Sequence, residues 1–143
     1  MDEKSPPLSE ERAKLFHRMV IQLLFASKRA QPDIQVCVAF LCTRVKYSTE
    51  RDYKKLARVI SYLQERNHSS SIDLIVGADT SGKVIWNVDA SYMAHPDCKS
   101  HTVACLTFDH ESVLSLSSKQ KIATQNSTKA ELVGVNDAMT FVM

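Results

Sequence analysis

The stretch KVIWNVDAS, residues 83–91, decides the fold of the second half of the chain. Its side chains alternate between apolar and polar, which is the period of a β-strand. One face carries Val84, Trp86, Val88 and Ala90, and the other carries Ile85, Asn87, Asp89 and Ser91. Burying an unpaired carboxylate is costly. Asp89 therefore either faces water on an edge strand or lies where negative charge is needed.

Further strand-like runs flank this stretch, and a helical pattern follows them. Short apolar and β-branched runs bounded by turn residues are typical of strands. The expected strands are 72–79, 83–91, 101–108 and 112–119. The segment NSTKAELVGVNDAM, residues 126–139, then predicts a helix with Asn126, Ser127 or Thr128 as its N-cap. The turn FDHES contains no glycine, which leaves the geometry of that hairpin open.

The first half predicts three helices, because apolar residues recur there at spacings of three and four. Ser9 is expected to cap the first, Pro32 to lie in the first turn of the second, and Ser48 or Thr49 to cap the third. Each is expected to have roughly 12 to 20 residues. Their apolar residues are Leu15, Phe16, Met19, Val20, Leu23 and Leu24, then Ile34, Val38, Leu41, Cys42 and Val45, then Tyr53, Leu56, Ile60 and Leu63. These faces are wide for three helices, so we expect a further partner surface.

The polar, serine-rich run ERNHSSS, residues 65–71, is the clearest linker. We therefore expect an α+β chain with a helical segment at 1–67 and a sheet with one packed helix at 68–143. Residues 1–70 carry 13 Lys and Arg against 8 Asp and Glu, whereas residues 71–143 carry 5 against 8. A basic half joined to an acidic half indicates two roles, or two halves that attract one another.

Composition narrows the class of protein. Hydrophobic residues make up 44% and charged residues 24% of the 143 residues, as in globular proteins. There is no apolar run long enough to span a membrane, and the acidic start MDEKSPPLSEER does not resemble a secretory signal. The four cysteines form no CxxC pair. Reduced thiols in an intracellular protein, cytoplasmic or nuclear, are therefore expected.

Asp89 on a strand and Glu131 near the start of the last helix are the carboxylates of interest. A helix packed across a sheet brings such residues together, and paired carboxylates bind hard cations such as Mg²⁺. Two metal ions held in this way activate water for phosphodiester cleavage. The alternative is that both are ordinary solvated surface groups.

The order VDASYMAHPDCKSHT, LSLSSKQK and NSTKAELVGVNDAM resembles the ribonuclease H domain of copia-type retrotransposon polyproteins. That family has a strand Asp in a VDAS or SDAD setting, then an HP or GDP segment and an S-x-T strand entry. A strand ending in SSKQ and a helix beginning SSTEAE follow. Upstream, LSEERAKLFHRMVIQLLFASKRA and DYKKLARVISYLQ resemble the end of the reverse transcriptase in the same elements. The resemblance covers nearly the whole chain.

The resemblance implies a ribonuclease H-like sheet in which Asp89 and Glu131 are the first and second catalytic carboxylates. Both would be Mg²⁺ ligands in the hydrolysis of RNA in an RNA–DNA hybrid. The family's third catalytic Asp follows this helix on a later strand and would fall beyond Met143. Lys129 also stands where the family has an acidic residue.

From these departures we expect an incomplete sheet and an inactive chain whose partners include the missing polyprotein segments. An open sheet edge would favour self-association. The alternative is a non-enzymatic remnant that binds protein or nucleic acid.

Three smaller features complete the sequence. His95, Cys98, His101 and Cys105 form H-x2-C-x2-H-x3-C, for which zinc ligands and incidental residues are both open interpretations. Arg51, Lys54, Lys55 and Arg58 form a basic helix face that either contacts phosphates or is simply solvated. SLSSKQ, residues 115–120, lacks the G-x-S-x-G setting of a nucleophile elbow and is interpreted as the polar end of a strand.

Overall fold

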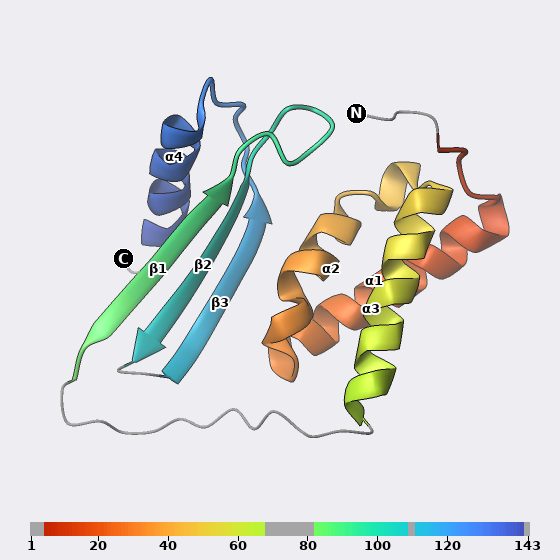
Figure 1. Ribbon diagram of the computed structural model, residues 1–143, viewed down its shortest axis with the longest axis horizontal. Helices are drawn as coiled ribbons and strands as arrows, with labels where there is room; N and C mark the ends of the chain where they lie inside the picture. The colour runs from red at the N-terminus through yellow and green to blue at the C-terminus, as the bar shows by residue number, and fades with distance from the viewer. Residues whose placement is uncertain (1–4, 68–81, 109–110, 142–143) are drawn as a thin grey trace. The chain divides into compact units, whose positions relative to one another are not determined.

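The structure is a computed structural model that describes residues 5–67, 82–108 and 111–141. The chain divides into two compact units, Met1–Ile72 and Asp73–Met143. The predicted α+β class is confirmed, because the described residues contain α-helices and one three-stranded antiparallel sheet (Figure 1). The expected boundary at 67/68 and the expected strand at 72–79 lie outside the described residues.

The first unit is helical. It contains α1 (Glu10–Arg29), the 3₁₀ turn η1 (Pro32–Ile34), α2 (Gln35–Cys42), the 3₁₀ turn η2 (Val45–Tyr47) and α3 (Glu50–Asn67). All three helices contribute to one apolar core. Its buried members are Phe16, Val20, Ile34, Val38, Leu41, Leu56 and Val59. The three helices expected in this part of the chain are therefore confirmed, and Val59 joins the stripe expected on the third helix.

One detail of the helical prediction is wrong, and a second is confirmed only in part. The second helix is much shorter than expected, because Thr43 Oγ1 donates to the Phe40 carbonyl at 2.7 Å and the Arg44 amide to the Leu41 carbonyl at 2.9 Å. In both bonds the acceptor is the carbonyl three residues earlier in the chain. Such bonds form tight turns, which end α2 at Cys42, so Val45 lies in η2. Ser9 does stand at the N-cap of α1, but among the described residues its side chain accepts no capping hydrogen bond.

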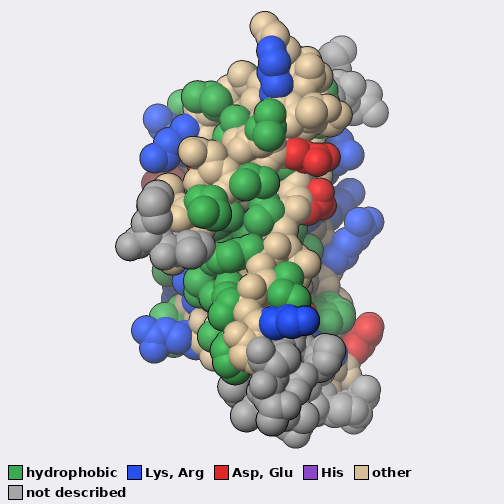
Figure 2. Space-filling model, turned by 90° about the vertical axis from the view of Figure 1, so that its left-hand side faces the viewer, with side chains coloured by type: hydrophobic (Ala, Val, Ile, Leu, Met, Phe, Trp, Pro, Cys, Tyr) green, Lys and Arg blue, Asp and Glu red, His purple; other side chains and the backbone are tan. Residues whose placement is uncertain are grey.

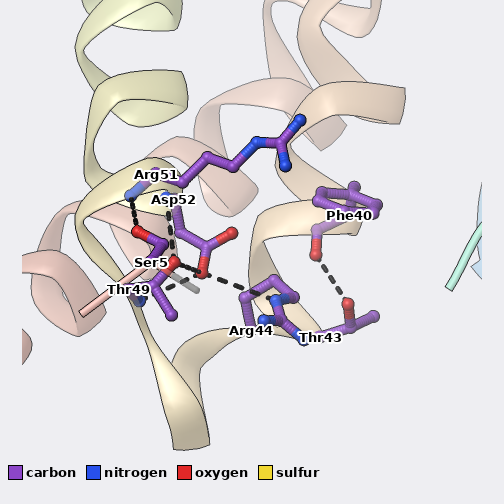
Figure 3. A network of polar contacts seen from close by, with 7 residues as sticks. All are labelled: Ser5, Phe40, Thr43, Arg44, Thr49, Arg51 and Asp52. Atoms are coloured by element: carbon purple, nitrogen blue, oxygen red, sulfur yellow. Dashed lines mark hydrogen bonds and ion pairs between the residues drawn. The ribbon is translucent and has the colours of Figure 1, made fainter. Parts of the chain in front are cut away.

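The start of α3 is held by a distant segment as well as by its own cap. Thr49 and Asp52 bond reciprocally. The Thr49 amide and hydroxyl donate to Asp52 Oδ2 at 3.0 and 2.7 Å, and the Asp52 amide donates to Thr49 Oγ1 at 3.4 Å. In addition, the Arg51 amide donates to Ser5 Oγ at 3.1 Å (Figure 3). The Glu50 amide donates to the Pro6 carbonyl at 3.0 Å. The first turn of a helix leaves its amides without intrahelical partners, and here residues near the start of the chain supply acceptors.

The second unit is an antiparallel sheet of order β1-β2-β3, made of β1 (Val84–Ser91), β2 (His101–Phe108) and β3 (Glu111–Lys119). The three strands expected in this region are confirmed. A register shift lies at Leu106/Thr107, next to the turn that lacks glycine. Within the described sheet β1 and β3 are the edge strands, and the expected self-association through an open edge stays a prediction.

Helix α4 (Ser127–Met139) packs on the sheet through a stripe of small residues (Figure 1). Ala130, Gly134 and Ala138 are buried at spacings of four. Asn126 is the N-cap, since its side chain accepts from the Lys129 amide at 2.8 Å. Of the three caps that the sequence left open, the structure selects this one.

The outer side of α4 is apolar and exposed. Figure 2 shows hydrophobic side chains gathered on the side of the molecule where α4 lies. The exposed apolar residues of this segment are Leu132, Val135, Met139 and Phe141.

Of the helices in the described ranges, none has the length and apolar character that crossing a membrane requires.

Candidate functional site

Asp89 lies near the end of β1 and is exposed. Its Oδ1 accepts a hydrogen bond from the amide of the next residue, Ala90, at 2.9 Å. Glu131 lies in the first turns of α4 and is also exposed. Both carboxylates of the family resemblance are therefore accessible to solvent.

The packing of α4 places these two carboxylates on different sides of the sheet. A Cβ built on Gly134 would lie 3.4 Å from Ala90 Cβ, so Ala90 faces α4. Successive strand residues point to opposite faces, so Asp89 lies on the face away from α4. Glu131 lies on the helix that covers the other face.

A two-metal centre needs several ligands that converge on one place. Across residues 5–67, 82–108 and 111–141, no three His, Cys, Asp or Glu side chains are grouped so that they would hold a metal ion. The donor set described by the structure therefore does not fit a magnesium centre of the family type. The assignment of Asp89 and Glu131 as Mg²⁺ ligands stays a prediction.

The contact between α4 and the sheet is reinforced by a buried amide. Gln120, which is 1% exposed, donates from Nε2 to the Ala130 carbonyl at 2.7 Å and to Thr102 Oγ1 at 3.0 Å. Hydrogen bonds between buried groups are costly to break, because a partner is then left unsatisfied. SLSSKQ was interpreted as the polar end of a strand, which did not predict that its last residue, Gln120, would bond to α4.

The basic face of α3 divides into two kinds of side chain. Arg51, Lys54 and Arg58 are exposed, at spacings of three and four. Lys55 is half-buried, with Nζ 4.2 Å from the centroid of the Phe40 ring. Burial lowers the pKa of Lys55, and the neighbouring Arg51 and Arg44 lower it further, while Asp52 opposes them. Lys55 therefore takes part in packing, and the other three remain available to a ligand.

Charges of both signs meet at the start of this helix, where the first turn carries Glu50 and Asp52. Asp52 is buried and pairs with Arg44 at 3.5 Å (Figure 3). In the same view Arg51 extends from α3 on the side where Phe40 lies. The charges of Arg51 and Arg44 act on Lys55, and the opposite charge of Asp52 partly offsets them.

The histidines and cysteines of the zinc pattern do not come together as four ligands. His95 Nε2 and His101 Nδ1 are hydrogen-bonded to each other at 2.9 Å. Cys98 is exposed, in a turn with φ 59°, and Cys105 contacts Ser112 Oγ at 3.1 Å. The two histidines form a buried pair, which the sequence pattern did not predict.

Acid is expected to destabilise the sheet unit through this pair. Burial lowers the pKa of His101, so the folded state binds a proton less readily than the unfolded state. The contribution of neutral His101 to the free energy of unfolding is therefore fully present above the unfolded pKa of about 6.5. It decreases as the pH drops below that value, by at most about 1.4 kcal/mol per pH unit for one proton. The groups near His101 include His95, Ser117 and, across the strand pair, Lys119.

The measurement is urea unfolding between pH 7.5 and 5.0, followed by the fluorescence of Trp86 in β1. His101→Gln should flatten the dependence on pH, whatever it does to stability at pH 7.5. His17→Gln, at an exposed position of α1, controls for the loss of a histidine. An unchanged slope in His101→Gln would refute the assignment.

No protein-family model, no curated protein and no solved structure matches this chain.

Proposed function

We propose that the chain is a ribonuclease H-like element of a copia-type retrotransposon polyprotein that does not cut RNA by itself. One observation carries the proposal: three antiparallel strands are followed by a helix packed on their sheet, with Asp89 on the first strand and Glu131 near the helix start. This is the order of elements and carboxylates that the family resemblance implies. The exposure of both carboxylates is compatible with a role at a surface that meets a hybrid duplex.

Inactivity follows from the ligand set. Two carboxylates on different sides of a sheet hold a divalent ion weakly, because Mg²⁺ requires ligands in a compact octahedral arrangement. In the described part of the chain no third acidic, His or Cys side chain joins them in a metal-binding group. No catalytic step is therefore assigned to these residues.

An end-labelled RNA–DNA hybrid should stay intact when it is incubated with the folded chain and Mg²⁺ or Mn²⁺. Asp89→Asn and Asp97→Asn are tested beside it. Asp97 is a carboxylate of the same unit that pairs with Lys119 at 2.7 Å and so has a separate role. Cutting by the unmodified chain that disappears in Asp89→Asn and persists in Asp97→Asn would overturn the proposal of inactivity.

A second function, binding of nucleic acid without cleavage, is favoured by the basic face of α3. Exposed Arg and Lys side chains in one stripe contact successive phosphates and release counterions, which makes the affinity dependent on salt. Arg51, Lys54 and Arg58 have this arrangement. Lys55 is set apart from them because its ammonium group lies over Phe40.

Replacing Arg51, Lys54 and Arg58 by Gln is expected to weaken binding of an RNA–DNA hybrid by a factor on the order of ten or more at low salt. The slope of log affinity against log salt should fall by about 0.9 for each phosphate that the variant no longer neutralises, on the scale of B-form DNA. Fluorescence anisotropy at a series of salt concentrations measures both quantities.

A matched triple substitution of Lys14, Arg18 and Lys28, which are exposed on α1, removes the same charge from another helix. This control should weaken binding much less. Equal losses of affinity in the two triple variants would show that net charge alone, and not the α3 face, attracts the nucleic acid.

A further inference from the structure

A continuous chain of hydrogen bonds joins three side chains of the sheet unit. Ser117 Oγ on β3 lies 2.8 Å from Nε2 of His101 on β2. The other ring nitrogen of His101, Nδ1, lies 2.9 Å from Nε2 of His95, which belongs to the segment between β1 and β2. A hydroxyl, an imidazole and a second imidazole are therefore connected in sequence.

This arrangement has the connectivity of an activated nucleophile. In such sites a histidine accepts the hydroxyl proton through one ring nitrogen, and a third group bonded to the other nitrogen fixes its tautomer and orientation. We propose that Ser117 is a nucleophilic serine, with His101 as its general base and His95 as the positioning residue, and that it reacts with activated acyl esters. The proposal is independent of the ribonuclease H-like function.

The burial of the three residues fits these roles. His95 and His101 are 1% and 5% exposed, whereas Ser117 is only half-buried. The base is thus shielded from water, and Ser117 is the least buried residue of the three. Burial also lowers the pKa of His101, which keeps this imidazole neutral and able to accept a proton near pH 7.

The backbone fixes the geometry on both sides. In the sheet register Ser117 pairs with Val103, and His101 lies two residues before Val103, so the two side chains are diagonal neighbours on one face. His95 is held by its own main chain: its amide donates to the Lys99 carbonyl at 3.0 Å, and its carbonyl accepts from the Cys98 amide at 2.9 Å. These bonds fix the main chain of His95, and the His101 ring is oriented by its bonds to the side chains of His95 and Ser117.

In the acylation step Ser117 Oγ attacks the carbonyl carbon of the ester and its proton passes to His101 Nε2. Collapse of the tetrahedral intermediate breaks the bond to the leaving oxygen, which takes that proton and departs as an alcohol. Water, deprotonated by His101 in the same way, then attacks the acyl carbon. The bond from that carbon to Ser117 Oγ breaks, His101 returns the proton to Oγ, and the acyl group departs as a carboxylic acid. With a fluorophosphonate the new bond is from Oγ to phosphorus, fluoride leaves, and the proton passes from His101 to solvent.

The test is labelling of the full chain with a fluorophosphonate probe, followed by mass spectrometry of its peptides. We expect one label per chain, on Ser117, with a rate that rises as His101 loses its proton. Ser117→Ala should abolish the label, and His101→Gln should slow it at least tenfold. Ser115→Ala, at the next position on the same strand face, should leave the rate unchanged.

His95→Gln tests whether His95 orients the His101 ring or only supports the fold, because glutamine retains a hydrogen-bond acceptor. It should move the midpoint of the pH–rate profile, which a merely structural role would leave in place. Trp86 fluorescence and circular dichroism show which variants are folded. The absence of labelling on the folded unmodified chain, or an equal rate in Ser117→Ala, would overturn the proposal.

Discussion

Phe16→Ala is expected to destabilise the helical unit by about 3–5 kcal/mol. Phe16 is fully buried in the cluster that unites the three helices. Truncating it loses the transfer free energy of the ring and leaves a cavity that rigid neighbours fill only in part. Since small units are stable by only about 5–15 kcal/mol, the loss removes a large share of the stability. The urea midpoint of the far-ultraviolet circular dichroism measures it.

Leu15→Ala provides the matched control. Leu15 is the preceding residue of α1 and is 44% exposed. Its truncation should change the free energy of unfolding by about 0.5 kcal/mol or less. Similar losses of stability for the two variants would mean that the core of the helical unit is not centred on Phe16.

Gly134→Leu is expected to disrupt the packing of α4 on the sheet, at a cost of about 1–3 kcal/mol or more. A Cβ at this position would already lie 3.4 Å from Ala90 Cβ and 3.5 Å from Thr102 Cγ2. The remaining carbons of leucine have to enter the space that the helix and the strands already fill. Urea unfolding followed by Trp86 fluorescence measures the effect.

Two substitutions isolate the steric cause. Gly134→Ala adds only the Cβ at an ordinary contact distance and gains helix propensity of about 1 kcal/mol, so it should be neutral or stabilising. Val135→Leu adds volume at the next position, which is exposed, and should have little effect. Tolerance of Gly134→Leu comparable to that of Gly134→Ala would contradict the close approach of α4.

The regular elements followed from local patterns. The alternation of residues 83–91 predicted both the existence of β1 and the division of its faces, because a strand has a period of two. The end of α2 did not follow, since the apolar spacing continues to Val45 while hydrogen bonds three residues back end the helix at Cys42. Periodicity indicates which side chains face the core. It does not indicate whether a backbone amide donates to the carbonyl three or four residues back.

The candidate sites depended on information of longer range. Asp89 and Glu131 were singled out by their expected places on a strand and a helix and by the family resemblance, but the face that α4 covers is set by how closely small residues such as Gly134 and Ala90 approach. The pairing of Ser117 with His101 depends on the register of β2 and β3. Hairpin register is fixed by turn type, and a turn without glycine does not specify it in the sequence.

The order of synthesis gives the first turn of α3 an unusual dependence. The Ser5 hydroxyl and the Pro6 carbonyl, which accept the amides of Arg51 and Glu50, leave the ribosome well before those amides are made. Ser5 and Arg51 are 46 residues apart. The early segment therefore has to remain available until α3 emerges, and α3 completes its amino-terminal turn only when that segment meets it. Any process that binds residues 5–8 first, such as a chaperone or a fused leader, would delay the formation of α3. It would not delay α4, which follows later in the chain.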